Sequence, residues 1–594
     1  SMGCSFIETL HQLQKHSAES VDFLEEFSDQ SRYLHVDRPI QDHLIKILKE
    51  ESSQRKKSLI LLCGSAGDGK SHMLSYLKNV SDGSFLDGYT TRNDATESDA
   101  PNRTAPETLA DALRAFNDNN LDDGGDEKII IAINLGLLSR FLEEPSGANF
   151  TRLKAYVDQC GLLKTGISHT DESQETAFRA IDFSDYQVFT LEDGKIKTDF
   201  IDELFKKVFA DNQENYFYQS AQKACSACQA DKSICPVRHN YDFMTSPLVQ
   251  RSISKILVEI ALRECCVITT RAILNFIYDL IVSPVFDINE LSKLSATDVN
   301  AFASKYLSMT TPQLLYSSMA KDELMGKAAS LDPINDLSGF VDELAIKLQA
   351  SSEFINEMIP YISDTPYETS LRKFTGFKPD NLQGNTKKTA SMKSEILRFI
   401  VRCAYLSFGA DERTHKISRV EYVDEYARIL FAYNTGDNKG LKDLKKALTK
   451  AIEDWNGDYP NGYSLLKTYG DIQILQKVKV QHRKTALTNS PDCALEKFRP
   501  YVLIDETLKE KESGDFVTFQ IDYNLFCLLM RIERGYQPTL MDKNLFSSFE
   551  NSYEVLLSQG SKGSELCLAR RSSGKRPFAE IRLDEDDEFS AEGI

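Results

Sequence analysis

One octapeptide constrains the fold of this chain more than any other part of its sequence. Residues 64–71 read GSAGDGKS, which satisfies the pattern G-x-x-x-x-G-K-[ST]. A short apolar run, KSLILLC at 57–63, precedes the octapeptide, and residues 70–78 follow it with helical spacing. A strand, a glycine-rich turn and a helix in this order predict a phosphate-binding loop, because backbone N–H groups and the positive end of the helix dipole then face an anion.

The residues of this loop have separate expected roles. Lys70 is expected to reach the β- and γ-phosphates of ATP, and the hydroxyl of Ser71 to hold Mg²⁺. The alternative is a chance glycine-rich turn, and the strand before the motif and the helix after it argue against that. The residues predicted to hold the nucleotide are Gly64, Ser65, Ala66, Gly67, Asp68, Gly69, Lys70, Ser71 and His72.

ATP hydrolysis on such a loop usually needs an acidic residue at the end of another strand, where it holds Mg²⁺ and orients water. The most β-branched run of the chain, KIIIAIN at 128–134, ends in Asn134 instead. Asn134 is therefore interpreted as a polar sensor that faces the γ-phosphate. Candidates for the missing carboxylate are Asp94, Asp182 and Asp185, and a solvated turn explains each of them equally well.

Two further sites bear on catalysis. The run YVLIDE at 501–506 also ends in acids, but it lies far along the chain from the loop, and sequential strands usually lie close in space. We therefore do not expect Asp505 at the loop. Arg271 opens a helix, and in ATPases with a helical lid an arginine at this place often points at the γ-phosphate, because its fork is always charged. A surface arginine is the alternative.

Strand-like and helical runs alternate over the first 200 residues. The runs at 57–63, 85–92, 128–134 and 179–191 read as strands, and this alternation predicts a parallel sheet covered on both faces. Helical spacing then dominates up to about Trp455, and strand-like runs return after about Asp471.

The predicted fold is an α/β P-loop NTPase core with an AAA+-like parallel sheet, a helical lid, a large helical region and a C-terminal α+β domain. The predicted domains are an N-terminal helical segment at 1–50, the nucleotide-binding core at 51–200, the lid at 201–290, a helical domain at 291–470 and a β-containing domain with an acidic tail at 471–594.

A cluster of potential metal ligands lies in the predicted lid. The spacing is Cys225-x2-Cys228-x6-Cys235-x3-His239. Three thiols and one imidazole suit tetrahedral Zn²⁺, and a full set of four ligands predicts a structural site. An iron–sulfur cluster more often uses four cysteines, and free cysteines in a helical hairpin are the other alternative.

The charge of the chain is unevenly distributed. Of the formal net charge of −19, residues 81–130 hold twelve acidic and four basic side chains, and residues 584–594 hold six acidic and no basic ones. A basic footprint over the whole surface is thereby excluded, whereas local basic sites stay open.

Two such basic sites are candidates for contact with DNA or a partner, and a solvated face is the favoured alternative for each. The acidic tail directly follows the second site and is expected to compete with DNA for it. The first site is a strip with Lys477, Lys479, His482, Arg483 and Lys484, and the second is the tip of a predicted hairpin with Arg570, Arg571, Lys575 and Arg576.

The cellular location is predicted from what the sequence lacks. It has no run of 18 or more apolar residues, and its start, SMGCSFIETL, has no basic region followed by an apolar one. Its 12 cysteines are scattered, as is usual in a reducing compartment. A cytoplasmic protein without a membrane span is expected.

Several segments resemble one family of bacterial defence ATPases. These are LLCGSAGDGKSHMLSYL, RNDATES, KIIIAINLG, CPVRHNY, TTRAILNFIYDLIV and, near the C-terminus, IDYNLFCLLMRIERGYQPTLMDKNLF. They are similar to the F component of the DNA phosphorothioation-dependent restriction system (DptF, also called DndF). The resemblance covers most of residues 55–290 in patches and about residues 496–550.

The resemblance implies an ATPase that acts with two partner subunits, G and H, against DNA that lacks the sulfur modification. It implies ATP and Mg²⁺ at the loop, whereas Asn134 departs from the acidic residue that usually ends this strand. One alternative is a non-hydrolysing, nucleotide-gated scaffold subunit of a defence complex. Another is a small-molecule kinase that uses the same loop.

Overall fold

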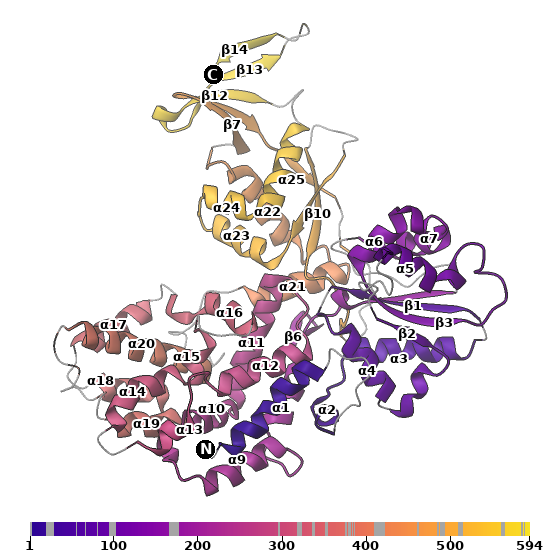
Figure 1. Ribbon diagram of the computed structural model, residues 1–594. Coiled ribbons are helices and arrows are strands. Elements are labelled where there is room, and N and C mark those ends of the chain that lie inside the picture. Colours follow the sequence, from indigo (N-terminus) through magenta and orange to yellow (C-terminus); the bar gives the residue numbers. More distant parts are fainter. Residues whose placement is uncertain are drawn as a thin grey trace. The chain divides into compact units, whose positions relative to one another are not determined.

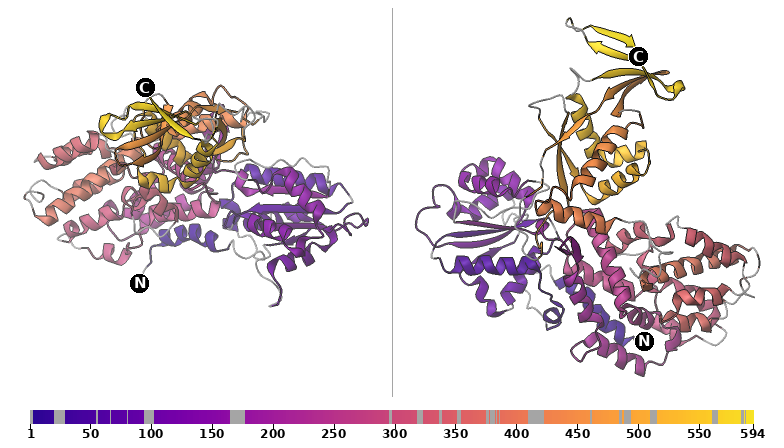
Figure 2. Two further views of the ribbon diagram at one scale, coloured as in Figure 1. Left: turned by 90° about the horizontal axis from the view of Figure 1, so that it is seen from above. Right: turned by 180° about the vertical axis from the view of Figure 1, so that it is seen from behind.

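The structure is a computed structural model in which the chain divides into two compact units. The first comprises Ser1–Leu163, His169–Phe189 and Thr198–Val420, and the second Lys164–Ser168, Thr190–Lys197 and Glu421–Ile594 (Figures 1 and 2). The structure describes all residues other than 1–2, 20–28, 55, 66, 80, 94–101, 165–176, 295–297, 318–322, 336–338, 351–353, 375–376, 378–381, 383, 385, 409–421, 460–461, 484–485, 488–493, 509–514, 560–564, 584–585 and 587.

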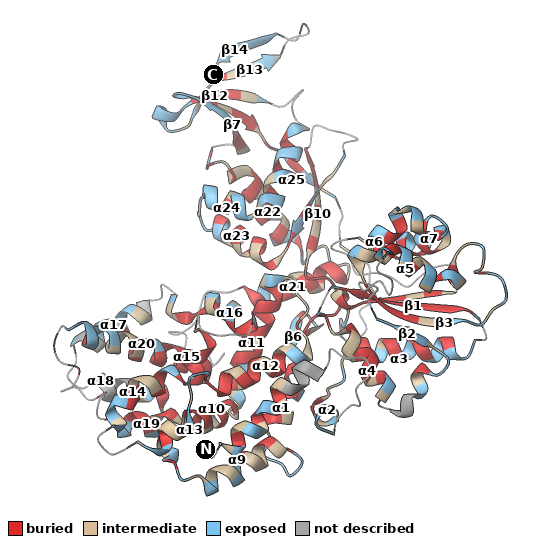
Figure 3. Ribbon diagram, in the orientation of Figure 1, coloured by how far each residue is buried: buried red, intermediate tan, exposed pale blue. Residues whose placement is uncertain are grey.

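A four-stranded parallel sheet lies in the first unit, with the strand order β2-β3-β1-β4. Helices cover both of its faces, as the alternating pattern predicts (Figure 1). Alternate residues of β1 explain this: Leu59 and Leu61 pack with the helices α5, α6 and α7, whereas Ile60 and Leu62 pack with α3 and α4. Figure 3 shows β1 and β3 buried between these layers. The bounds are β1 (Ser58–Gly64), β2 (Thr90–Arg92), β3 (Lys128–Asn134), β4 (Phe178–Asp182), α3 (Pro39–Ser52), α4 (Lys70–Asn79), α5 (Ala105–Ala112), α6 (Leu135–Glu143) and α7 (Thr151–Cys160).

Two expected strands are shorter than predicted. The run at 85–92 forms a strand only at Thr90–Arg92, because a 3-10 turn at Ser81–Leu86 takes its first residues. The run at 179–191, expected as a strand with an acidic turn, is a strand up to Asp182, whose side chain accepts a hydrogen bond from the Ser184 N–H at 2.8 Å and starts that turn. Side-chain bonds to the local backbone compete with the sheet ladder at such a position.

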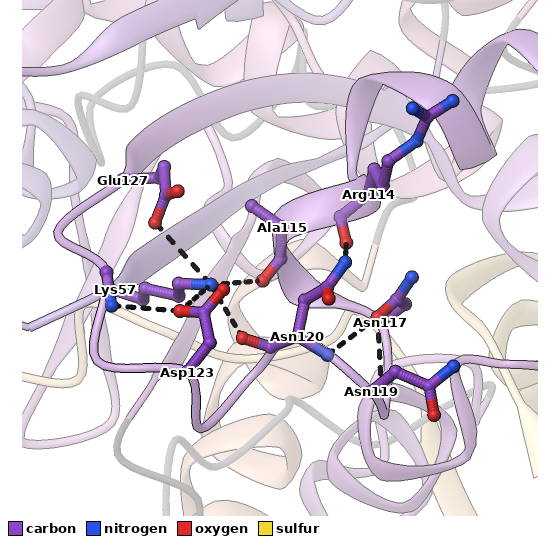
Figure 4. A network of polar contacts seen from close by, with 9 residues as sticks. Lys57, Arg114, Ala115, Asn117, Asn119, Asn120, Asp123 and Glu127 are labelled. Carbon is purple, nitrogen blue, oxygen red and sulfur yellow. Dashed lines mark hydrogen bonds and ion pairs between the residues drawn. The ribbon is translucent and has the colours of Figure 1, made fainter.

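A buried lysine ties part of the acidic segment at 81–130 to the sheet (Figure 4). Lys57 stands at the start of β1, and its Nζ donates to the carbonyls of Ala115 (2.9 Å) and Asn120 (2.6 Å). The same ammonium pairs with Asp123 at 2.6 Å and with Glu127 at 3.5 Å. The negative charge of this segment is thus partly balanced at the end of the sheet opposite to the glycine-rich loop.

Helices form the rest of the first unit. α1 (Ser5–Glu19) packs on α9 and α12, so this N-terminal segment belongs to the helical part of the unit. No helix in the described ranges is both long enough and apolar enough to span a bilayer. The other bounds are α2 (Asp29–Leu34), α8 (Asp199–Phe209), α9 (Tyr216–Ala227), α10 (Pro236–Met244), α11 (Pro247–Glu264), α12 (Thr270–Ile281), α13 (Ile288–Ser292), α14 (Val299–Ser308), α15 (Thr311–Leu315), α16 (Glu323–Ala328), α17 (Gly339–Ala350), α18 (Phe354–Ile362), α19 (Tyr367–Lys373) and α20 (Lys387–Phe408).

The second unit combines helices with antiparallel sheets of orders β11-β10-β9 and β14-β13-β12-β8-β7. It begins about 50 residues before the expected boundary at 471, at Glu421, because α21 packs on β10 and α22 packs on α23. Its strands are β5 (Thr190–Glu192), β6 (Lys195–Lys197), β7 (Tyr463–Tyr469), β8 (Ile472–Lys477), β9 (Val480–His482), β10 (Val502–Leu508), β11 (Val517–Ile521), β12 (Leu566–Arg570), β13 (Pro577–Leu583) and β14 (Phe589–Gly593). Its helices are α21 (Val423–Asn434), α22 (Lys442–Asp454), α23 (Tyr523–Glu533), α24 (Leu540–Leu545) and α25 (Ser547–Ser558).

Candidate nucleotide-binding site

The glycine-rich loop lies at the carboxyl end of the parallel sheet. β1 ends at Gly64 and α4 begins at Lys70, so strand, turn and helix follow in the predicted order. Gly67 and Gly69 have φ angles of 76° and 95°, a left-handed conformation that glycine adopts without steric cost. Ala66 lies outside the described residues.

A cavity of about 320 Å³ opens at this loop. Its walls come from parts of the first unit that are distant in sequence: the loop with the start of α4, the residues around the start of α3, Asn93 after β2, Phe183 and Tyr186 after β4, and residues 267–271 up to the start of α12. Val36 and Ile40 give it an apolar side next to the polar loop, which suits a ligand with a flat base and a charged chain. The predicted residues that line the cavity are Gly67, Asp68, Gly69, Lys70, Ser71, His72 and Arg271.

Lys70 is held by the loop itself. Its Nζ donates to the Ser65 carbonyl at 2.6 Å and to Asp68 Oδ1 at 2.8 Å. Asp68 is only 5% exposed, and burial raises the pKa of its carboxyl group. A side chain at Gly64 would exclude this arrangement, since an ideal Cβ there would lie 1.7 Å from Asp68 Oδ2. The Asp68 carboxylate therefore holds the ammonium group of Lys70, the cation expected to contact a phosphate.

Replacing Asp68 by asparagine is expected to strengthen ATP binding about tenfold, because a carboxylate near a phosphate costs about 1–4 kcal/mol at 4 Å. Titration calorimetry with ATP and Mg²⁺ measures the change. Asp87→Asn, at an exposed position outside the cavity, is the matched control. Weaker binding by Asp68→Asn would show that the carboxylate assists the nucleotide instead of opposing it.

Ser71 contacts Asn93, a residue for which no role is expected from the sequence. Its Oγ donates to Asn93 Oδ1 at 3.1 Å, and both residues line the cavity. Asn93 directly follows β2, the neighbour of β3 in the sheet. Asp94 lies outside the described residues. The signal for Asn93 was its position as the first polar side chain after a strand.

Arg271 lies at the start of α12, beside residues that approach the loop. The Thr269 hydroxyl caps α12 by accepting a hydrogen bond from the Ala272 N–H at 3.1 Å. Thr269 also approaches the loop, since an ideal Cβ at Gly69 would lie 3.8 Å from its Cγ2. Arg271 is exposed and lines the same cavity as Lys70. The cavity is thus lined by three cationic side chains, Arg38, Lys70 and Arg271, from segments up to about 230 residues apart.

Comparison with known protein families finds no family model that matches the chain, and no curated protein matches it either.

The other polar candidates lie beside the loop and outside the cavity walls. Asn134 is the register partner of Gly64, but its Oδ1 accepts a hydrogen bond from the Gly136 N–H at 2.7 Å and so caps α6. Asp182 is the register partner of Cys63 on the other side of β1. Asp182 and Asp185 are both fully buried, so neither is an acid in a solvated turn.

The predicted zinc ligands do not form a metal-binding group. Among the described side chains, no three His, Cys, Asp or Glu residues are placed to hold a metal ion. Cys225 and Cys228 lie at the end of α9 and Cys235 caps α10, and burial raises the pKa of Cys235 to about 12. His239 is engaged elsewhere: its Nδ1 lies 2.8 Å from the Tyr306 hydroxyl. Zinc binding stays a prediction, which the metal content of the purified protein tests.

His239 predicts a pH dependence of stability. It is only 7% exposed, and burial, aided by Arg238 and opposed by Asp231, lowers its pKa to about 4. In the unfolded chain the histidine pKa is about 6.5, so the unfolded chain binds a proton at this side chain more readily than the folded one. The stability that neutral His239 contributes is therefore present above pH 6.5 and is lost as the pH falls toward 4.

From these pKa values we expect the unfolding free energy to fall by about 2 kcal/mol from pH 7 to pH 5 because of His239. Urea unfolding of the wild type and of His239→Gln at both pH values measures it. His11→Gln, on α1, is the control and should keep the wild-type pH dependence. Equal pH dependence of wild type and His239→Gln would contradict the prediction.

The two basic sites of the second unit differ in their partners. In the first, Lys477 pairs with Glu565 at 2.9 Å and Arg483 pairs with Asp505, while Lys484 lies outside the described residues. Asp505 belongs to the antiparallel sheet β11-β10-β9, as expected from its distance in sequence from the loop. The second site is the turn between β12 and β13, which form the predicted hairpin.

Proposed function

We propose that the chain is the ATP-binding and ATP-hydrolysing subunit of a bacterial antiphage restriction complex. The observation that carries the nucleotide part is the cavity in which the glycine-rich loop, Lys70, Ser71 and Arg271 meet. Backbone N–H groups at a helix start and the cations Arg38, Lys70 and Arg271 around one cavity are a chemistry suited to a triphosphate.

The roles of the residues follow from their placement. Lys70 would exchange its contact with Asp68 for the β- and γ-phosphates, and Arg271 would balance charge on the γ-phosphate from the start of α12. The Ser71 hydroxyl, next to Asn93, fits Mg²⁺, which supplies charge neutralisation between the phosphates when it is bound. Asp94 follows Asn93 directly and is the proposed carboxylate that orients water.

The finer fold assignment belongs to the same proposal. A P-loop NTPase core of the AAA+ type is supported by the order β2-β3-β1-β4, in which the strand before the loop lies between two parallel neighbours. It is also supported by α12, which carries Arg271 to the cavity from the helical part of the unit.

The choice of DNA as the target rests on the resemblance to the F-component family. By that resemblance the chain works in the cytoplasm with the G and H subunits on DNA that lacks phosphorothioate. The prediction of zinc in the helical lid belongs to the same proposal.

A non-hydrolysing, nucleotide-gated scaffold is the second candidate. The observation that favours it is the cavity wall itself, where Asp68 is the acidic residue among the described lining residues and is already paired with Lys70. A site without a further carboxylate binds ATP but orients water poorly.

Phosphate release from ATP and Mg²⁺ by the purified chain, alone and with the G and H subunits and unmodified or phosphorothioate DNA, tests the proposal. We expect turnover that rises with unmodified DNA. ATP binding without turnover in any mixture would favour the scaffold. Turnover that rises with one small metabolite and not with DNA would favour a kinase.

A further inference from the structure

Two hairpin turns of the second unit are bound to each other. The turn between β7 and β8 contains Asp471, and the turn between β12 and β13 contains Arg571 and Ser572. The Arg571 N–H donates to the Asp471 carbonyl at 2.8 Å, and Ser572 donates to both Asp471 carboxylate oxygens, at 2.9 and 2.7 Å. The two turns therefore form one fixed surface, here called the double-hairpin tip.

The sheet register places an open row of side chains at this tip. Tyr469 pairs with Ile472, and Ile472 pairs with Arg570 across β7, β8 and β12. Paired residues of antiparallel strands share a face, so these three lie on one side of the sheet. Tyr469 is 57% and Ile472 39% exposed, whereas Leu475 and Cys567 on the opposite face are buried in a core cluster.

Cations of the tip are held over aromatic rings. Lys467 lies 5.1 Å from the Tyr469 ring centroid, Arg570 lies 5.3 Å from that of Phe578, and Lys575 lies 5.1 Å from that of Tyr459. A ring orients a cation without cancelling its charge, so it stays available to an anion.

The backbone of the turn also favours this arrangement. Gly574 and Lys575 have φ angles of 70° and 62°. The left-handed region is uncommon for a residue other than glycine, and a long side chain there usually has a reason. In this turn the left-handed backbone directs Lys575 toward Tyr459.

Other cations of the same sheet are neutralised. Lys477 pairs with Glu565 at 2.9 Å, and Arg582 pairs with Glu580 and Glu592, each at 3.4 Å. By contrast, no ion pair between described residues involves the tip cations, which are Lys467, Arg570, Arg571, Lys575 and Arg576. One carboxylate stands near two of them: hydrogen bonds from Ser572, and after them the charges of Arg570 and Arg571, lower the pKa of the Asp471 carboxyl group.

The acidic tail leads away from the tip and then returns toward it: Gly593 pairs with Ala579, and the Ile594 N–H donates to the Phe578 carbonyl at 2.9 Å. The expected competition with DNA therefore stays a prediction. β13 leads away from the turn at 571–576 for seven residues, and the chain returns as β14 from Phe589. Asp586 and Glu588 therefore lie at the far end of β13, about 20 Å away at 3.3 Å per residue. That distance exceeds the screening length of about 8 Å at physiological salt.

We propose that the double-hairpin tip is a docking surface for the phosphate backbone of DNA. The unpaired cations, their fixed geometry and the exposed Tyr469 carry the proposal; only the choice of DNA as the anion rests on the proposed function. Phosphate contacts position a protein on DNA without reading its sequence.

The test uses the full chain without ATP and a fluorescent 20-bp duplex, with anisotropy measured over a series of salt concentrations. Arg570→Ala/Arg571→Ala is expected to weaken binding at least tenfold at low salt. It should also make the salt dependence shallower by about 2, because each lost phosphate contact removes about 0.9 from the slope. Lys477→Ala/Arg582→Ala removes the same charge from ion-paired positions and should stay within twofold of wild type.

Three results would overturn the proposal. The first is no DNA binding by the wild type at low salt, and the second is an equal loss of DNA affinity in both double variants. The third is unchanged DNA binding by Arg570→Ala/Arg571→Ala together with lost binding of the G or H subunit. The last result would assign the tip to a protein partner. Phosphate release without DNA, measured on the same samples, separates this proposal from the ATPase proposal. Thermal unfolding checks the fold, and Lys467→Ala/Arg576→Ala repeats the test if the first variant is unstable.

Discussion

Replacing Lys70 by alanine is expected to lower ATP hydrolysis by about 100-fold or more, the usual cost of removing one preorganised charge from a reacting phosphate. Lys70 is the first residue of α4, is 7% exposed and points at the carboxyl end of the sheet through its contacts with Ser65 and Asp68. No other cation of the loop can replace it, since residues 64–71 contain a single basic side chain.

Lys70→Ala also affects the stability of the loop. Alanine at position 70 leaves the buried Asp68 carboxylate without its cation, which destabilises the loop in its own right. Asp68→Asn/Lys70→Ala removes both charges and isolates the loss of phosphate contact. Lys78→Ala, at an exposed position on the same helix, is the control. Phosphate release by the double variant at the wild-type rate would contradict the role of Lys70.

Replacing Asn240 by alanine is expected to lower the unfolding free energy of the first unit by at least about 4 kcal/mol. The side chain is fully buried, and its Nδ2 donates to the carbonyls of Ile281 (2.9 Å) and Met309 (2.8 Å). Its Oδ1 accepts from the Thr311 N–H and the Tyr367 hydroxyl, each at 2.8 Å. Each buried group that loses its partner costs roughly 1–3 kcal/mol.

The functional consequence follows from where these partners lie. Asn240 on α10 joins the end of α12 to the segment between α14 and α15, and α12 is the helix that brings Arg271 to the cavity. Urea unfolding followed by circular dichroism measures the loss, with Asn119→Ala at an exposed position as control. A loss below 1 kcal/mol would show that the helical part repacks without this network.

Much of the local structure around the glycine-rich loop was predictable because its signals are local. The glycines at 67 and 69 are needed for left-handed backbone, and the β-branched run at 128–134 has few alternatives to a buried strand. Arg271 was predictable because a threonine cap marks the start of its helix. Asp68 was placed in the loop, but its inward turn onto Lys70 was not foreseen, since sequence does not tell which way a side chain folds.

Other features depend on contacts between residues that are distant in sequence. His239 has ligand spacing after three cysteines, yet its Nδ1 meets Tyr306 from a helix 67 positions along the chain. The basic strip at 477–484 and the double-hairpin tip look alike as sequences, but only the register of β8 with β12 brings Glu565 to Lys477. Long-range pairing of this kind leaves no trace in the residues next to a cation.

The sequence by itself determined the strand, glycine turn and helix at 57–78, the parallel α/β pattern and the hairpin at 565–583, because backbone preferences and apolar spacing act over a few residues. Only the tertiary structure decided that Asn93 meets Ser71, that Thr269 and Arg271 line the cavity and that Arg570 lies over the ring of Phe578. These contacts join segments up to 200 residues apart, and they exist only once packing has brought the segments together.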